Sequence, residues 1–292
     1  MAEETVRLEA RAKVNLFLRV LSRGADGYHG IETLFCLVDL ADGLAATRTE
    51  TGTVTIEVSG ADAGPAAQNL AARAAERVVV ATGRRFGVHL ALEKRIPVQA
   101  GLGGGSSDAA AALIAVNRLA NDAVPRHELL QFAAHLGSDV PFFLSGAQLA
   151  LAWNRGERMI RLPPLPAAPM LLLIPPIGIP TPEAFQWIDA TRPTNQRGAI
   201  ALDLDSIRTW GNVARMSGND FEAAVFGKQP AIHAAFEAMV ATRPVLCRMS
   251  GSGSAVVGVY RSSRDRADAR DMLGRKHGRV IETGTAGLNV ED

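Results

Sequence analysis

The stretch that decides the fold is Pro97-Val98-Gln99-Ala100-Gly101-Leu102-Gly103-Gly104-Gly105-Ser106-Ser107-Asp108. Four of the five residues from 101 to 105 are glycine, so backbone N–H groups can close around an anion without side chains in the way. A strand-like alternation of apolar residues over 88–92 precedes the loop. An alanine-rich helix predicted over 107–120 follows it and points its positive dipole end at the loop. This order of strand, glycine loop and helix start predicts a phosphate-binding site, with a flexible surface turn as the alternative.

Spacing excludes two common phosphate-binding motifs. A P-loop requires a lysine after its glycines, and none follows them here. A dinucleotide-binding fingerprint does not fit in either frame, because its third glycine would fall on Ser106 or Asp108. The loop ends instead in Ser106 and Ser107, whose hydroxyls can donate to phosphate oxygens or ligate magnesium. We expect Asp108 to act as a cap at the helix start rather than as a catalyst.

Composition indicates a globular protein large enough for two domains. The chain has 292 residues, of which 47% are hydrophobic and 21% charged, and its formal net charge is +1. No dense run of Lys and Arg predicts a nucleic-acid partner, and no apolar run is long enough to predict a membrane span. The two cysteines, Cys36 and Cys247, are predicted to be free thiols, and with no evident leader segment they favour a cytoplasmic location.

Patterning along the chain predicts an α+β protein of two domains, 1–162 and 163–292. Four prolines between 163 and 169 interrupt any regular element and mark the boundary near Leu162. Strand patterns fall at 6–20, 54–58, 88–92, 170–174, 245–249, 255–260 and 279–283. Helical patterns fall at 69–81, 107–120, 126–136, 221–226, 231–241 and 264–276.

Three polar positions are candidates for chemistry. In the strand predicted over 6–20, Lys13, Asn15 and Phe17 alternate with apolar residues, so Lys13 and Asn15 should project together from rigid backbone. Asp139, between a helix and Val140-Pro141, could accept a proton from a hydroxyl, or it could merely cap the next helix. A second loop of small residues, 250–254, could be a bare hairpin turn or could close the phosphate site from the other domain.

Taken together, these segments resemble the GHMP kinase superfamily nearly from end to end. The glycine-serine loop marks the superfamily, and narrower motifs select one branch of it. Those motifs are Ala12-Lys13-Val14-Asn15-Leu16-Phe17-Leu18, Ala25-Asp26-Gly27-Tyr28-His29, Gly137-Ser138-Asp139-Val140-Pro141-Phe142-Phe143, Ile179-Pro180-Thr181-Pro182, Gly218-Asn219-Asp220-Phe221-Glu222 and Met249-Ser250-Gly251-Ser252-Gly253. The resemblance implies a two-domain GHMP kinase fold, an active site in the inter-domain cleft, and an enzyme that phosphorylates a small-molecule alcohol with ATP and Mg²⁺.

The resemblance also implies roles for individual residues. Lys13 and Asp139 fall on the catalytic positions. The nucleotide would be held by Pro97, Val98, Gln99, Ala100, Gly101, Leu102, Gly103, Gly104, Gly105, Ser106 and Ser107, with Asn69 and Lys94 near the nucleoside. The substrate would contact Asn15, Tyr28, His29, Thr181 and Phe185. No dedicated protein metal site is expected, because His and Cys do not recur at ligand spacing.

The substrate that this branch implies is cytidine-diphosphate-linked methylerythritol, phosphorylated on its 2-hydroxyl on the route to isoprenoid precursors. Tyr28 and Phe185 offer aromatic faces for a base, which mevalonate and homoserine lack. A mevalonate-type or homoserine kinase is the first alternative, and a non-catalytic nucleotide-binding protein of the same fold is the second. We expect a monomer or a weak homodimer.

Overall fold

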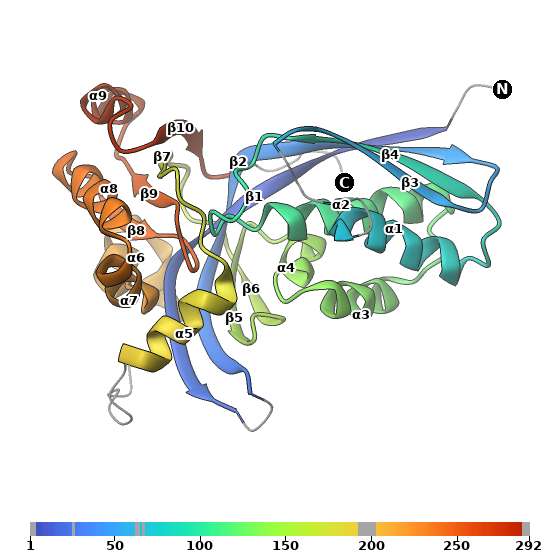
Figure 1. Cartoon of the computed structure of the whole chain (residues 1–292), viewed down its shortest axis with the longest axis horizontal. Coiled ribbons are helices and arrows are strands. Elements are labelled where there is room, and N and C mark those ends of the chain that lie inside the picture. Colours follow the sequence, from blue (N-terminus) through green and yellow to red (C-terminus); the bar gives the residue numbers. More distant parts are fainter. Residues whose placement is uncertain (1–3, 25–26, 62–64, 66–67, 192–202, 288–292) are drawn as a thin grey trace.

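Two β-sheets organise the chain, and helices pack against each of them (Figure 1). The computed structural model describes residues 4–24, 27–61, 65, 68–191 and 203–287. Within these residues the first sheet has six strands in the order β3-β4-β2-β5-β6, with β1 paired to β2. The second has four strands in the order β10-β7-β9-β8. This mixture of sheets and helices confirms the predicted α+β class.

The elements of the first sheet come from the first 162 residues. Its strands are β1 (Thr5–Arg23), β2 (His29–Thr49), β3 (Val54–Gly60), β4 (Gly87–Lys94), β5 (Leu149–Asn154) and β6 (Arg158–Leu162). Its helices are α1 (Leu70–Ala81), α2 (Gly104–Leu119), α3 (Arg126–Leu136) and α4 (Val140–Ser145). The sequence patterns located β1, β3, β4, α1 and α3, and they missed β2, β5 and β6.

The remaining elements follow the proline-rich connection after β6. They are β7 (Pro169–Ile174), α5 (Thr181–Thr191), η2 (Leu204–Arg208), α6 (Trp210–Met216), α7 (Phe221–Lys228), α8 (Pro230–Ala241), β8 (Leu246–Met249), β9 (Val256–Val259), α9 (Ser263–Leu273) and β10 (Arg279–Gly284). Here the sequence patterns located β7, α7, α8, β8, β9, α9 and β10. No helix in the described part of the chain has both the length and the hydrophobicity that crossing a membrane requires.

The antiparallel pair of β1 and β2 is the longest feature of the fold and reaches both sheets. The pair runs through the first sheet, passes beside the second and ends beyond α5 (Figure 1). The register shifts between Asn15 and Phe17. Because of this irregularity Phe17 does not share the face of Lys13 and Asn15, as the alternation predicted, but is buried with Leu16 in the core beside the second sheet.

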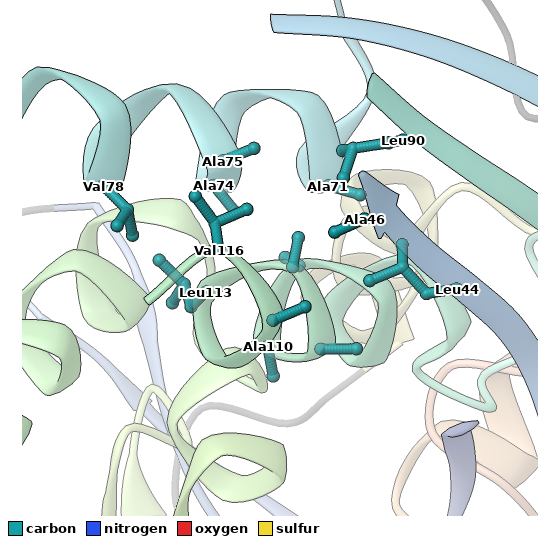
Figure 2. Close-up of a cluster of buried hydrophobic side chains, with 14 of the residues drawn as sticks. Leu44, Ala46, Ala71, Ala74, Ala75, Val78, Leu90, Ala110, Leu113 and Val116 are labelled. Carbon is teal, nitrogen blue, oxygen red and sulfur yellow. The ribbon is translucent and has the colours of Figure 1, made fainter. Parts of the chain in front are cut away.

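Small side chains let α1 and α2 pack closely against the first sheet. Figure 2 shows alanines and short branched residues of both helices facing Leu44 and Ala46 of β2 and Leu90 of β4. Asn69 begins α1 by accepting a hydrogen bond from the backbone N–H of Ala71 at 2.9 Å. This tightly packed layer provides a rigid base for the start of α2, which follows the glycine loop.

The first turn of α2 corrects one prediction. The helix begins at Gly104, three residues before the predicted start, because Gly103 takes the left-handed conformation that precedes it (φ 72°). Gly104, Gly105 and Ser106 are therefore helical, and their backbone N–H groups belong to the unpaired first turn of a helix. The glycine loop and the helix N-terminus form one continuous surface.

Candidate active site

A cleft of about 980 Å³ is lined by both halves of the chain, with β1, β2 and the glycine loop from the first half and α5 and the turn after β8 from the second. Every site residue predicted from the sequence lines this cleft except Ser107, whose side chain is buried behind the loop. The cleft thus brings together the glycine loop, Lys13, Asp139 and the aromatic segment around Tyr28. These segments are far apart in the chain.

The glycine loop takes a shape that side chains would obstruct. Gly101 has φ 76°, and a Cβ placed on it would lie 2.0 Å from the carbonyl oxygen of Ser250. A Cβ on Gly103 would lie 2.9 Å from the Phe143 ring and 3.1 Å from the side chain of Lys13. Glycine is needed at both positions for backbone conformation and for space. The loop therefore presents its backbone to the cleft.

The second small-residue loop closes the first one, so the bare-hairpin alternative is wrong. The Ser250 hydroxyl donates to the Gly101 carbonyl at 2.9 Å and accepts from the backbone N–H of Asn15 at 3.2 Å. The N–H of Ala255 donates to the carbonyl of Ala100 at 3.1 Å. The 250–255 segment thereby holds the glycine loop and connects it to β1.

Lys13 and Asp139 form an ion pair in the wall of the cleft. The Lys13 ammonium lies 3.4 Å from an Asp139 carboxylate oxygen and donates to Asn15 Oδ1 at 2.7 Å. Asn15 in turn donates to the Thr33 hydroxyl at 2.7 Å, so the ammonium is held from the strand side. The common projection of Lys13 and Asn15 is confirmed.

The carboxylate of Asp139 is not used for capping. Asp139 occupies the N-cap position of α4, but its side chain makes no capping hydrogen bond. About 27% of that side chain is exposed to the cleft, while the Lys13 side chain is 5% exposed. This carboxyl group, next to the Lys13 ammonium, is placed where it can contact a bound hydroxyl.

Lys94 belongs to a buried charge cluster beneath the loop. Its ammonium contacts Asp42, and it donates to Asp108 Oδ2 at 2.7 Å. Asp42 also accepts from the backbone N–H groups of Arg95 and Ile96 at 2.5 and 2.8 Å. The prediction that Asp108 caps α2 is wrong, because its carboxyl lies in the second turn and faces Lys94.

Burial raises the pKa of Asp108 to about 7, against the opposing effect of the Lys94 charge and with a further increase from Asp42. The cluster holds one cation and two carboxyls in a nearly dry site. A proton on Asp108 at neutral pH lessens the excess negative charge. Because both carboxyls surround the Lys94 ammonium, any contact that Lys94 makes with a nucleoside remains a prediction.

The aromatic end of the cleft joins the β1–β2 hairpin to α5. The rings of His29 and Phe185 are stacked at 5.2 Å with an interplanar angle of 7°. His29 Nε2 also lies 2.9 Å from Asp189 Oδ1, and Nδ1 lies 3.2 Å from the Leu21 carbonyl oxygen. Thr181, at the start of α5, hydrogen-bonds with the Ser252 hydroxyl at 3.1 Å. Asp189 was missed in the sequence because nothing local distinguishes it from a solvated helix residue.

Tyr28 is the most exposed residue of this aromatic group, at 59%. The guanidinium of Arg155 lies over its ring, 3.9 Å from the ring centroid. Arg155 comes from the turn between β5 and β6, which the sequence patterns did not locate. The aromatic end therefore contains a cation as well as ring faces.

The residues of the cleft fit a bound nucleoside triphosphate. Gly101, Gly103, Gly104 and Gly105 of the loop line the cleft, and the N-terminus of α2 adds its dipole. No group of three or more His, Cys, Asp or Glu within the described residues could hold a metal ion by itself. Magnesium commonly binds through substrate phosphates and one or two protein oxygens, and Ser106 and Asp139, which both line the cleft, could supply such oxygens.

Comparison with known proteins agrees with this geometry. The sequence profile of the GHMP kinases N terminal domain matches residues 69–147, and that of the GHMP kinases C terminal domain matches residues 199–280. The chain is 38% identical to the 4-diphosphocytidyl-2-C-methyl-D-erythritol kinase of Pelotomaculum thermopropionicum, over 91% of this chain and 92% of the relative. It is 38% identical to the enzyme of the same name from Moorella thermoacetica, over 96% and 98% of the two chains.

Solved structures place the chain in the same group. A crystal structure of 4-(cytidine 5'-diphospho)-2C-methyl-D-erythritol kinase superposes with a TM-score of 0.80 at 36% identity, covering 97% of this chain and all (100%) of the other. A homoserine kinase from Cytophaga hutchinsonii shares the fold alone, with a TM-score of 0.70 at 18% identity over 98% and 96% of the chains. The chain is a small-molecule kinase of the GHMP superfamily, and within it belongs to the family of the 4-diphosphocytidyl-2-C-methyl-D-erythritol kinases.

Proposed function

We propose that the protein transfers the γ-phosphoryl group of ATP to the 2-hydroxyl of 4-diphosphocytidyl-2-C-methyl-D-erythritol. The observation that carries the proposal is the Asp139 carboxylate, which caps no helix and lies 3.4 Å from the Lys13 ammonium in a cleft that the glycine loop also lines. The relatives that match along most of the chain are named for this activity. In this proposal residues 1–162 hold the nucleotide and residues 163–292 complete the cleft.

In the proposed reaction Asp139 accepts the proton of the 2-hydroxyl while the hydroxyl oxygen forms its bond to the γ-phosphorus. The bond between that phosphorus and the β–γ bridging oxygen breaks, and ADP leaves. Lys13 pairs with Asp139 and offsets the charge that develops between acceptor and phosphate. Asn15 orients Lys13 from the strand. Bound with ATP, Mg²⁺ supplies further charge neutralisation on the phosphates.

The glycine loop and the start of α2 contribute by holding phosphates in line with the acceptor. Backbone N–H groups do not change position when the charge shifts, because Ser250 and Ala255 fix the loop from the other side. Ser106, in the first turn of α2, adds a hydroxyl at the cleft. Ser107 is buried, and we assign it to the support of the loop rather than to phosphate contact.

The aromatic end supports a substrate that carries a base. Tyr28 and Phe185 present rings to the cleft, and His29 adds polar ring atoms beside them. Mevalonate and homoserine have no group that needs these rings. Asn15 and Thr181 lie on the cleft wall and complete the substrate contacts in this proposal.

A direct test is to offer the purified protein ATP with each of three alcohols. We expect phosphorylation of 4-diphosphocytidyl-2-C-methyl-D-erythritol, with the new phosphate on the 2-hydroxyl by phosphorus NMR, and little or no reaction with mevalonate or homoserine. Preferred turnover of either of the latter would overturn the substrate assignment. ATP binding without turnover of any of the three would support the non-catalytic alternative.

A further inference from the structure

The motif Gly218-Asn219-Asp220-Phe221-Glu222 leads into α7 and has no part in the proposed reaction. Asn219 is the buried polar residue of this motif, at 8% exposed. Its amide nitrogen donates to the Met249 carbonyl at 2.7 Å and to the Gly251 carbonyl at 2.8 Å. Its amide oxygen accepts from the Phe221 N–H at 3.0 Å. Both N–H donors of this amide are therefore used on a single turn, the one that follows β8.

The two carbonyls that Asn219 holds lie on either side of Ser250, the residue that closes the glycine loop. Met249 precedes Ser250 in the chain and Gly251 follows it. Glu222 adds a further bond, because its carboxylate accepts from the Met249 N–H at 2.9 Å. The backbone on both sides of Ser250 is thus fixed, and the place of the Ser250 hydroxyl depends on the Asn219 amide.

The turn held in this way contacts three parts of the site. The Ser250 hydroxyl donates to the Gly101 carbonyl at 2.9 Å and accepts from the Asn15 N–H at 3.2 Å. Two residues further on, the Ser252 hydroxyl hydrogen-bonds with Thr181 at 3.1 Å. The turn therefore joins the glycine loop to β1 and to the start of α5.

The motif is itself attached to β1. The Leu18 N–H donates to the Gly218 carbonyl at 2.8 Å, and the Leu18 carbonyl accepts from the Asp220 N–H at 3.0 Å. Leu18 and Asn15 belong to the same strand. Asn219 is consequently placed by the strand that it connects, through the turn, to the glycine loop.

We infer that Asn219 is a positioning residue for phosphoryl transfer and acts through Ser250 to hold the glycine loop in place against β1. The inference rests on the proposed function, which supplies the reaction that the loop serves. Asn219 does not line the cleft, so it has no contact of its own with a ligand there. Its effect on rate is geometric, since a displacement of about 1 Å between reacting groups can cost about a hundredfold.

The test is a double-mutant cycle on the full chain. Asn219→Ala removes the whole amide, whereas Asn219→Asp keeps an acceptor for the Phe221 N–H and replaces the donor to the two carbonyls by oxygen. Ser250→Ala removes the hydroxyl that contacts the glycine loop, and the variant carrying both alanines completes the cycle. Each protein is assayed for kcat and KM with the proposed substrate, for ATP affinity by calorimetry, and for its free energy of unfolding in urea.

Asn117→Ala is the matched control for loss of a buried amide. Asn117 lies in α2, is 4% exposed and does not line the cleft. Its amide bonds the Val124 carbonyl at 3.0 Å and the Val124 N–H at 2.9 Å. Its loss should lower stability as the loss of Asn219 does, without a bond to the glycine loop.

We expect Asn219→Ala, Asn219→Asp and Ser250→Ala each to lower kcat about tenfold to a hundredfold in the folded protein and to change the KM of the alcohol less than about threefold. The double variant should fall within about threefold of the worse single variant, because both substitutions break the same connection. Asn117→Ala should keep kcat within about twofold of the wild type.

The inference would be overturned by a wild-type kcat in either Asn219 variant, by losses that multiply in the double variant, or by an equal loss of kcat in Asn117→Ala. Each of these results leaves the proposed function intact. If the wild type phosphorylated none of the alcohols offered, the proposed function would fail and ATP affinity would decide the inference. A loss of affinity of about threefold or more in both single variants, not multiplied in the double variant, would support it, and unchanged affinity would refute it.

Discussion

Two lysines line the same cleft, and their carboxylate partners differ in number and in how deeply they are buried. Lys94 is enclosed with Asp42 and Asp108, and the side chains of all three are at most 4% exposed. Lys13 has one carboxylate partner, Asp139, at 3.4 Å and 27% exposed. The first arrangement is buried among its own charges, whereas the second leaves a carboxylate exposed to a ligand in the cleft. Lining a cleft therefore does not by itself indicate chemistry, and the exposure of the carboxylate separates the two cases.

Removing a carboxylate from each arrangement should have opposite effects on catalysis and on folding. Loss of the Asp139 carboxylate should affect catalysis and spare folding, because no backbone amide depends on it. Loss of Asp42 should do the reverse, because Asp42 holds Lys94 and two backbone N–H groups.

The largest expected effect is on turnover. Asp139→Asn should lower kcat by about 10²–10⁴-fold, since a general base contributes on that scale. ATP affinity by calorimetry and the free energy of unfolding in urea should stay close to those of the wild type, the latter within about 1 kcal/mol. Turnover that survived this substitution would show that Asp139 is not the base.

Next in size is the loss of the buried cluster. Asp42→Ala should lower the free energy of unfolding by about 3–5 kcal/mol, because it removes one partner from a buried ion pair and leaves backbone donors unsatisfied. Asp39→Ala, at an exposed position of the same strand, is the matched control and should cost about 1 kcal/mol or less. A similar cost for the two variants would mean that the buried cluster contributes little.

A smaller effect should follow from filling the space beneath the loop. Gly101→Ala and Gly146→Ala both place alanine at a positive φ, 76° and 73°, which costs about 1–2 kcal/mol. Only Gly101 has a backbone atom against the new Cβ, the Ser250 oxygen at 2.0 Å. Gly101→Ala should therefore cost about 1–3 kcal/mol more than Gly146→Ala in urea unfolding, and it alone should weaken ATP binding. Equal costs would contradict the close contact between the two loops.

The smallest expected effect is a change in how the free energy of unfolding depends on pH. Because the pKa of Asp108 is raised to about 7, the folded protein retains a proton that the unfolded chain releases near pH 4. The stabilisation from Asp108 is thus fully present below pH 4 and is lost as the pH rises to about 7, at up to about 1.4 kcal/mol per pH unit.

Asp108→Asn removes this titration and leaves Lys94 with one carboxylate, Asp42. The free energy of unfolding of the variant, minus that of the wild type, should therefore increase from pH 4 to pH 7 in urea titrations. A difference that stayed constant over this range would show that Asp108 does not hold a proton in the folded protein.

Local pattern was enough to predict part of this site. Strand alternation placed Lys13 and Asn15 together, and helical periodicity gave the bounds of α3 at residues 126 and 136. Glycine content indicated the loop, although the helix starts three residues earlier than helix propensity suggests. At Gly103 the left-handed conformation and the packing beneath the loop outweigh the low propensity of the next two glycines.

Contacts between distant residues could not be predicted in the same way. Lys94 and Asp42 are 52 residues apart, and the Ser250 hydroxyl bonds to a carbonyl 149 residues away. The periodicity of a strand or a helix gives no information about which distant residues pair. Asp189 and Arg155 were missed for the same reason. Neither differs from its neighbours in the sequence in a way that indicates a site, and only the folded structure shows that both line the cleft.

The contact between Ser250 and Gly101 has a consequence for biosynthesis. A ribosome releases residue 101 long before residue 250, and early segments of a chain commonly fold before later ones. Until the later turn emerges, the phosphate loop lacks the bonds from Ser250 and Ala255 that hold it in shape. The phosphate loop therefore gains these bonds only after residue 255 has been made.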